Sequence, residues 1–170
     1  GYEACLYVYK YARDIRMHWL STLMNINGAV TILDISTEDI NTTKVNINKS
    51  INEQRSRFNT AKEETERLDA QRKYSELTSL YTEISAMGDA VKIIQLRIFI
   101  PARTMVDVDD KAKEIIKYLE ANGYKAAICM NETKSDWNAM FNSYKEIQQT
   151  PYKRYGQPML SSTLAAGNPF

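Results

Sequence analysis

A stretch of the chain without glycine or proline limits its possible folds more than any other feature. Between Gly28 and Gly88 neither residue occurs, although the chain contains 6 glycines and 4 prolines. Glycine and proline interrupt helices, so this span can hold long, uninterrupted helical segments. Ser36 or Thr37, followed directly by two acidic residues, favours a helix start at the beginning of the span.

Apolar residues within this span follow helical spacing in two successive sets. The first set is Ile40, Ile47, Ile51, Phe58, Ala61 and Leu68, and the second is Tyr74, Leu77, Tyr81, Ile84 and Met87. The change of phase predicts a helical hairpin over about residues 38–87 that breaks between Leu68 and Lys73, with one continuous helix as an open alternative. A helix of about 30 residues is roughly 45 Å long, so we expect part of this insertion to protrude.

On each side of the helical span, the pattern predicts a strand, a helix and a second strand. The two units cover residues 4–35 and 91–130, and their helices begin after Asp14 and near Thr104. The predicted strands are residues 4–12, 29–36, 94–100 and 124–130. Two such units predict an α+β fold with a four-stranded, ferredoxin-like split βαβ sheet, with helices on one face and the helical insertion between the two halves.

The C-terminal part of the chain predicts one more helix and then an extended segment. Trp137, Phe141 and Tyr144 lie on one face of an amphipathic helix from Lys134 to Ile147. We expect it to complete a domain over residues 1–147. Three of the four prolines follow Gln148, which predicts an extended connector over residues 148–170.

Composition excludes several classes of function. The formal charge is only +1, which argues against binding held mainly by nucleic-acid phosphates or anionic lipid. Cys5 and Cys129 lack the spacing of a metal site or a disulfide framework and are predicted to be free thiols in a reducing cytosol. With His18 as the one histidine, zinc sites and histidine-based catalysis are not expected.

The chain also lacks the motif that nucleotide hydrolysis requires. No GxxxxGK[ST] sequence is present, so no phosphate-binding loop is expected. The apolar run Val30–Asp34 resembles a strand that ends in a magnesium-binding aspartate, but without the loop it indicates an ordinary buried strand with an exposed acid. We therefore expect no enzyme activity and no cofactor or metal in this part of the protein.

Two groups of residues are candidates for interaction. Tyr7, Tyr9 and Tyr11 alternate along the first strand and are expected to share one face of the sheet with Phe99. Aromatic residues on such a face can stack nucleic-acid bases, whereas packing against the final helix or against the next domain is the favoured alternative. The second group is Lys153-Arg154, a basic pair between tyrosines that could contact a phosphate or an acidic partner.

Five segments, in this order along the chain, resemble a known family. They are HWLSTLMNINGAVTILDIS (18–36), NINKSINEQ (46–54), IIQLRIFIPA (93–102), EANGYKA (120–126) and STLAAGNPF (162–170). The layout resembles the N-terminal, pre-catalytic region of the conjugative-transfer and type IV secretion ATPases, the CagE/TrbE/VirB family, and within it the Gram-positive TraE/TrsE-type branch.

The resemblance implies a non-catalytic assembly and docking domain of a larger ATPase. ATP and magnesium would bind in a C-terminal domain that this chain does not include. Other secretion-channel proteins and that ATPase lobe are the expected partners, with homo-oligomers possible in the parent protein. The implied location is the cytoplasm, peripheral to the inner face of the membrane through partners. Binding of single-stranded nucleic acid by the tyrosine-rich face is the alternative function.

Overall fold

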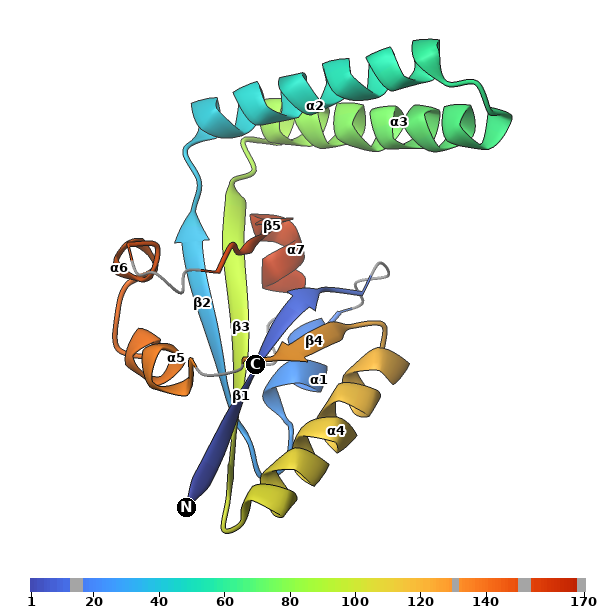
Figure 1. Ribbon diagram of the computed structural model, residues 1–170. Coiled ribbons are helices and arrows are strands. Elements are labelled where there is room, and N and C mark those ends of the chain that lie inside the picture. Colours follow the sequence, from blue (N-terminus) through green and yellow to red (C-terminus); the bar gives the residue numbers. More distant parts are fainter. Residues whose placement is uncertain (13–16, 130–131, 150–153, 168–170) are drawn as a thin grey trace. The chain divides into compact units, whose positions relative to one another are not determined.

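The protein is an α+β chain built around one antiparallel sheet, as a computed structural model of residues 1–12, 17–129, 132–149 and 154–167 describes it (Figure 1). Its strands are β1 (Tyr2–Lys10), β2 (Val30–Thr37), β3 (Val91–Ala102), β4 (Lys125–Ile128) and β5 (Gln157–Leu160). The sheet order is β2-β3-β1-β4, and β5 also pairs with β3. The predicted α+β class is confirmed, and the sheet has a fifth strand that the sequence did not predict.

The chain divides into two compact units. One contains Gly1–Ser36 and Lys92–Phe170 and holds most of the sheet, and the other contains Thr37–Val91. At the start of the second unit, the backbone N–H of Glu38 donates to the carbonyl of Val91 over 3.0 Å. The chain therefore leaves β2 and enters β3 at neighbouring points, and the helical segment forms one long connection between these strands.

Strand β3 carries the pattern that organises the sheet. It pairs antiparallel with β1 from Tyr2–Ala102 to Val8–Leu96. Its two faces differ as predicted, because Ile94, Leu96, Ile98 and Ile100 belong to the main core and Phe99 belongs to a separate buried cluster on the other face. Residues 94–100 are all buried, which gives the sheet a covered layer on each side.

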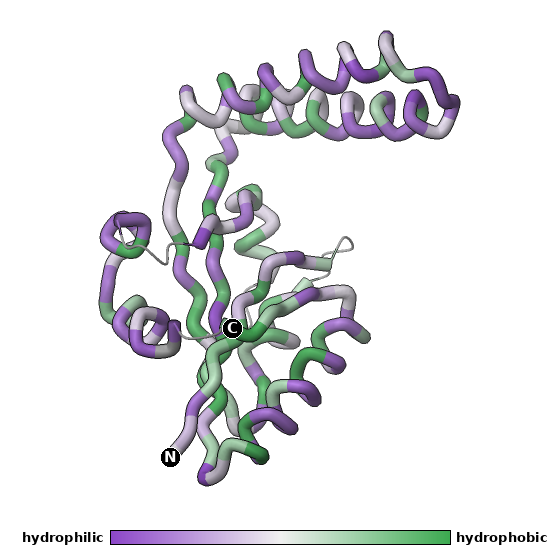
Figure 2. Tube along the Cα trace, viewed as in Figure 1, coloured by the Kyte–Doolittle hydropathy of each residue, from purple (hydrophilic) through white to green (hydrophobic). Residues whose placement is uncertain are grey.

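Helices α1 (Trp19–Met24) and α4 (Met105–Ala121) cover the first face of the sheet (Figure 1). The buried helix residues packed against the strands are Trp19, Leu20, Leu23, Ala112, Ile115 and Leu119. In α4 they recur at helical spacing, and Figure 2 shows hydrophobic and hydrophilic stretches alternating along this helix. This amphipathic stripe confirms the sequence-based prediction for the second helix.

Thr104 begins α4 as its N-cap, and its removal gives a first testable prediction. Its hydroxyl oxygen accepts from the backbone N–H of Asp107 over 3.1 Å. Thr104→Ala is therefore expected to lower the free energy of unfolding by about 1 kcal/mol in urea titrations. Thr104→Ser keeps the acceptor and is the matched control; equal losses in both variants would contradict a capping role.

The second unit is a helical hairpin of α2 (Ile40–Thr60) and α3 (Glu64–Met87). Asp39 caps α2, since its carboxylate accepts from the backbone N–H groups of Asn41 and Thr42, and the bond from Thr42 contributes most to lowering the Asp39 pKa. The hairpin thus replaces the alternative of one continuous helix. Figure 2 shows mostly hydrophilic residues along both helices, with hydrophobic residues interspersed among them.

The break in the hairpin lies at residues 61–63, earlier than the predicted position between Leu68 and Lys73. Ala61 and Glu63 both adopt extended backbone conformations, and the Thr60 hydroxyl donates back to the carbonyl of Ser56 over 2.9 Å. Leu68 is 58% exposed, so it belongs to no buried stripe. Its helical spacing from the preceding apolar residues therefore placed the predicted end of the first helix too late.

Among the described residues, no helix has both the length and the apolar composition that crossing a membrane needs.

The predicted helix from Lys134 to Ile147 is interrupted. It consists of α5 (Thr133–Ala139) and α6 (Tyr144–Ile147). Ser143 is extended and forms a capping box with Glu146, in which each side chain bonds the other residue's backbone N–H. This local bonding starts a new helix where the apolar spacing alone predicted a continuous one.

The segment after Gln148 contains regular structure where an extended connector was predicted. Residues 157–160 form β5, and α7 (Ser161–Ala166) follows. Met159 is buried in the main core, and the indole N–H of Trp19 donates to the carbonyl of Thr163 over 3.1 Å. Gly156, Pro158 and Gly167 therefore accompany a packed strand and helix.

Candidate functional site: a buried polar cluster on β3

The second face of β3 carries a buried charged side chain in a strand whose residues are mostly apolar. Arg97 is only 1% exposed, and Gln95 beside it on the same face is also buried. Burial of a guanidinium costs free energy unless the group is paired and hydrogen-bonded, so the partners of Arg97 determine whether it stabilises the fold.

Arg97 contacts three other side chains. Its Nη1 donates to Asp34 Oδ2 from β2, its Nη2 donates to Gln95 Oε1 over 3.2 Å, and its Nε lies 3.3 Å from Asp136 Oδ1 of α5. Burial raises the pKa of Asp34, while the charge and hydrogen bond of Arg97 act in the opposite direction. The guanidinium thus holds together two strands and the helix above them.

Arg154 extends this network toward the C-terminal segment. Its Nη2 pairs with Glu132 Oε2 and lies 3.6 Å from Asp136 Oδ2. Its carbonyl accepts from the side-chain amides of Gln95 and Gln148. We call these residues the Arg97 cluster: Asp34, Gln95, Arg97, Glu132, Asp136, Gln148 and Arg154.

Tyr7 of β1 fixes the same segment from a third strand. Its hydroxyl donates to the carbonyl of Tyr155, and the Arg154 guanidinium carbon lies 5.3 Å from the centre of the Tyr7 ring. Burial is the main cause that raises the Tyr7 pKa. Side chains of β1, β2 and β3 therefore all reach this face, and two of these strands bond the backbone at residues 154–155.

Tyr7→Phe gives a second prediction. The change leaves the ring in place but removes the donor to the Tyr155 carbonyl, so the free energy of unfolding is expected to fall by about 1 kcal/mol. Tyr9→Phe is the matched control, because Tyr9 is on the same strand and 45% exposed. Urea titrations of both variants test the expectation; an equal effect at Tyr9 would contradict the role given to the Tyr7 hydroxyl.

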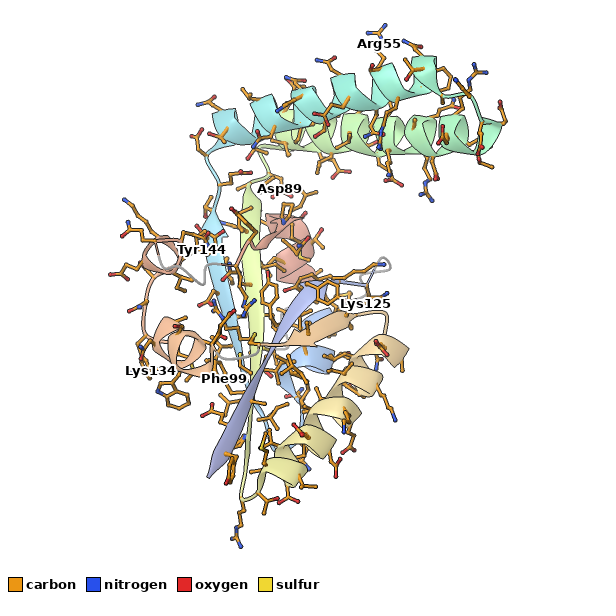
Figure 3. All side chains as sticks on the ribbon, viewed as in Figure 1. Arg55, Asp89, Phe99, Lys125, Lys134 and Tyr144 are labelled. Atoms are coloured by element: carbon orange, nitrogen blue, oxygen red, sulfur yellow. The ribbon has the colours of Figure 1, made fainter. Side chains whose placement is uncertain are left out.

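The four aromatic residues predicted to share one face of the sheet do not all do so. Tyr7 and Phe99 lie on the same face, but both are buried, and Phe99 meets Trp137 of α5 edge to face at 6.0 Å between centroids. Figure 3 places Phe99 beside this helix, which also carries the labelled Lys134. Packing against α5 thus occupies the Phe99 ring, whereas the Tyr7 ring lies beside the Arg154 guanidinium.

Tyr11 lies on the opposite face from Tyr7, which corrects the predicted alternation. It packs against the main core and meets Trp19 edge to face at 5.8 Å. The pairing of β1 with β4 shifts register between Val8 and Lys10, so strict alternation ends before Tyr11. Of the four aromatic candidates only Tyr9 is exposed, which leaves no stacking platform among them.

The predicted basic pair Lys153-Arg154 does not provide a free positive charge at Arg154 either. Lys153 lies outside the described residues, and Arg154 is held in ion pairs with Glu132 and Asp136, so its charge is compensated within the chain. Asp34, expected to be an exposed acid, is paired with Arg97 and 16% exposed at its side chain.

The cluster has little room for a ligand. A hollow of about 140 Å³ lies beside Arg97 and Asp136, smaller than the roughly 300 Å³ at which small-molecule sites begin. Within the described ranges, one group of potential metal ligands comes together, since atoms of Cys5, Cys129 and Asp136 lie within 4.8 Å of one another. Asp136 is already engaged by two guanidiniums, which oppose a cation at this point.

Sequence reasoning missed the pairing within the Arg97 cluster, although one signal for it exists. A glutamine and an arginine interrupt the apolar strand at Gln95 and Arg97, and a charged residue in such a strand is buried only when it is paired. The partners of Arg97 and Gln95 could not be predicted from the sequence, because they come from distant parts of the chain: β2, α5 and residue 154.

Comparison with known proteins gives a similarity over nearly the whole chain. No protein-family model matches the chain. The chain is 31% identical over 169 residues to an uncharacterized protein of Bacillus anthracis, pXO2-09. This alignment covers 99% of the chain but only 26% of the other protein, so the chain spans about a quarter of the length of its relative.

Proposed function

We propose that this chain is a non-catalytic assembly and docking domain of a conjugative-transfer or type IV secretion ATPase. Two lines of evidence support the proposal: the five family-like segments occur in order along the chain, and a relative that aligns over nearly all of it is about four times as long. In this proposal the ATP and magnesium sites belong to another domain, and the protein acts in the cytoplasm at the inner face of the membrane.

We also propose that the sheet is a ferredoxin-like split βαβ sheet with additions. The order β2-β3-β1-β4 and the antiparallel pairing of β1 with β3 and β4 support this assignment, as do α1 and α4 against one face. The hairpin then occupies the connection between the two halves, and β5 is an addition to β3. Many proteins with unrelated functions share such a fold, so the sheet alone does not indicate a function. The evidence for a docking role therefore has to come from the hairpin.

The observation that carries the docking role is the apolar surface left uncovered on the hairpin unit. Val45 and Leu68 are more than half exposed, and Phe58 and Tyr74 are each more than one-third exposed. Phe58 and Tyr74 line one hollow of about 300 Å³ together with polar side chains of both helices. Exposed apolar residues rimmed by polar ones are typical of protein–protein contact sites.

Removing the hairpin from the protein as the cell encodes it tests the proposal. Because Glu38 and Val91 are hydrogen-bonded neighbours, an Asn-Gly turn can replace residues 39–90 and join β2 to β3 directly. DNA-transfer frequency is expected to fall at least about a hundredfold, which corresponds to about 3 kcal/mol of lost partner affinity. ATP hydrolysis by the same variant is expected to stay within about twofold of the parent.

A point variant separates loss of docking from loss of folding. Phe58→Asp puts a charge into the hollow and should lower transfer, while Thr78→Asp on the exposed surface of α3 should not. Circular dichroism of each variant checks that the helices persist. Normal transfer in the variant without the hairpin would refute the docking role, and ATP hydrolysis by residues 1–170 alone would refute the non-catalytic assignment.

A further inference from the structure

The two cysteines occupy opposing positions on neighbouring strands. The antiparallel register of β1 and β4 pairs Leu6 with Ile128, which brings Cys5 opposite Cys129 at the next position. The backbone N–H of Cys129 donates to the carbonyl of Cys5 over 2.8 Å. Directly opposed residues on antiparallel strands point to the same face, and both thiols are buried in the same cluster as Tyr7 and Phe99.

This placement meets the geometric requirements of a disulfide. The Cα atoms of a disulfide are usually about 4.4–6.8 Å apart, and those of a hydrogen-bonded antiparallel pair are about 5.5 Å apart. The two sulfur atoms lie within 4.8 Å of each other, so side-chain rotation on a shared face brings them together without a change of register. Asp136, the third group nearby, is bound by Arg97 and Arg154, which leaves the two thiols as the reactive pair.

We propose that Cys5 and Cys129 form a redox-active pair that a small peroxide oxidises to an intramolecular disulfide between β1 and the end of β4. The Cys129 thiolate attacks one peroxide oxygen, the O–O bond breaks, and the released hydroxide takes up a proton to become water. The resulting sulfenic acid is attacked by the Cys5 sulfur, so that the S–S bond forms, the S–O bond breaks and a second water leaves. With hydrogen peroxide as the oxidant, two thiols are oxidised and one peroxide is reduced to two waters.

The environment of the two sulfurs favours this order of events. The hydrogen bond to Cys129, followed by burial, raises the pKa of the Cys5 thiol, so Cys5 keeps its proton during the first step. Access requires a local opening, and β4 is a four-residue edge strand with three exposed residues, the type of element that opens most readily.

Mass spectrometry of the reduced chain treated with hydrogen peroxide tests the proposal. After denaturation and capping with N-ethylmaleimide, the intact protein should have lost the mass of two hydrogen atoms and should carry no cap. Trypsin should release the fragment of residues 1–10 joined to that of residues 126–134. Dithiothreitol should separate the two fragments and restore two cappable thiols.

A register variant distinguishes this opposed pair from two independently reactive thiols. Ile128→Cys combined with Cys129→Ser moves the second thiol to the other face of β4, at a position that is already 39% exposed. Disulfide formation in this variant should be at least about tenfold slower than in the parent, since it requires a change of face. Two capped thiols in the treated parent, overoxidised single thiols, dimers as the main product, or an equal rate in the register variant would each overturn the proposal.

Discussion

Arg97→Ala is expected to lower the free energy of unfolding by about 3–5 kcal/mol, because it leaves buried carboxylates without their partner. Asp136 is 3% exposed and Asp34 is mostly buried, and both are paired with Arg97. Urea unfolding followed by circular dichroism measures the loss. Arg72→Ala is the matched control, since Arg72 pairs with Asp69 and Glu76 on an exposed helix surface and should cost less than about 1 kcal/mol.

The pH dependence of the Arg97→Ala variant gives a second readout of the same prediction. Burial already raises the pKa of Asp34, and removing Arg97 takes away the charge that opposes this shift. The folded variant then binds protons more tightly than the unfolded chain, so its stability should rise as the pH falls from 7 toward the unfolded-state value of about 4. A loss below about 1 kcal/mol at neutral pH, or stability that falls across this range more steeply than in the parent, would contradict the structural role of Arg97.

Gly156→Val is the second change with a large expected effect. A Cβ at this position would lie 2.3 Å from Ile93 Cγ2 and 2.9 Å from the carbonyl oxygen of Ile94, so β5 could not keep its place beside β3. We expect a loss of about 3 kcal/mol, at the upper end of what overpacking costs. Because Trp19 is buried and bonded to α7, displacement of this segment should also shift tryptophan fluorescence to the red.

Ala165→Val is the control for this change, since Ala165 is exposed on α7 and should tolerate a larger side chain. Urea titrations of the two variants, with fluorescence as the probe, separate a packed C-terminal segment from an extended connector. If both substitutions left stability and fluorescence unchanged, the segment would be a connector, as the sequence alone had predicted.

The elements that sequence reasoning predicted correctly are those whose periodicity is local. The alternation of Ile94, Leu96, Ile98 and Ile100 in β3 and the stripe from Val108 to Leu119 in α4 each follow from one short window of sequence. Each pattern has one dominant period, and the folded chain keeps it, since these faces enter the main core.

The features that were missed depend on residues far apart in the chain or on local bonding that breaks a period. Arg97 has partners from β2 and α5, and β5 is recognised by its place beside β3 and not by its composition. The register shift after Val8 turns Tyr11 to the other face, and the capping box at Ser143 divides the last predicted helix. Apolar spacing contains no information about either.

Site-specific photo-cross-linking in cells tests the central claim most directly. Phe58 is replaced by benzoylphenylalanine in the protein as encoded, in cells that carry the transfer genes, and the same substitution at the exposed Tyr9 of β1 is the comparison site. The docking account predicts an ultraviolet-dependent adduct between position 58 and a secretion-channel protein, identified by mass spectrometry, and no such adduct at position 9. Cross-links to nucleic acid at position 9, with none to protein at position 58, would contradict it.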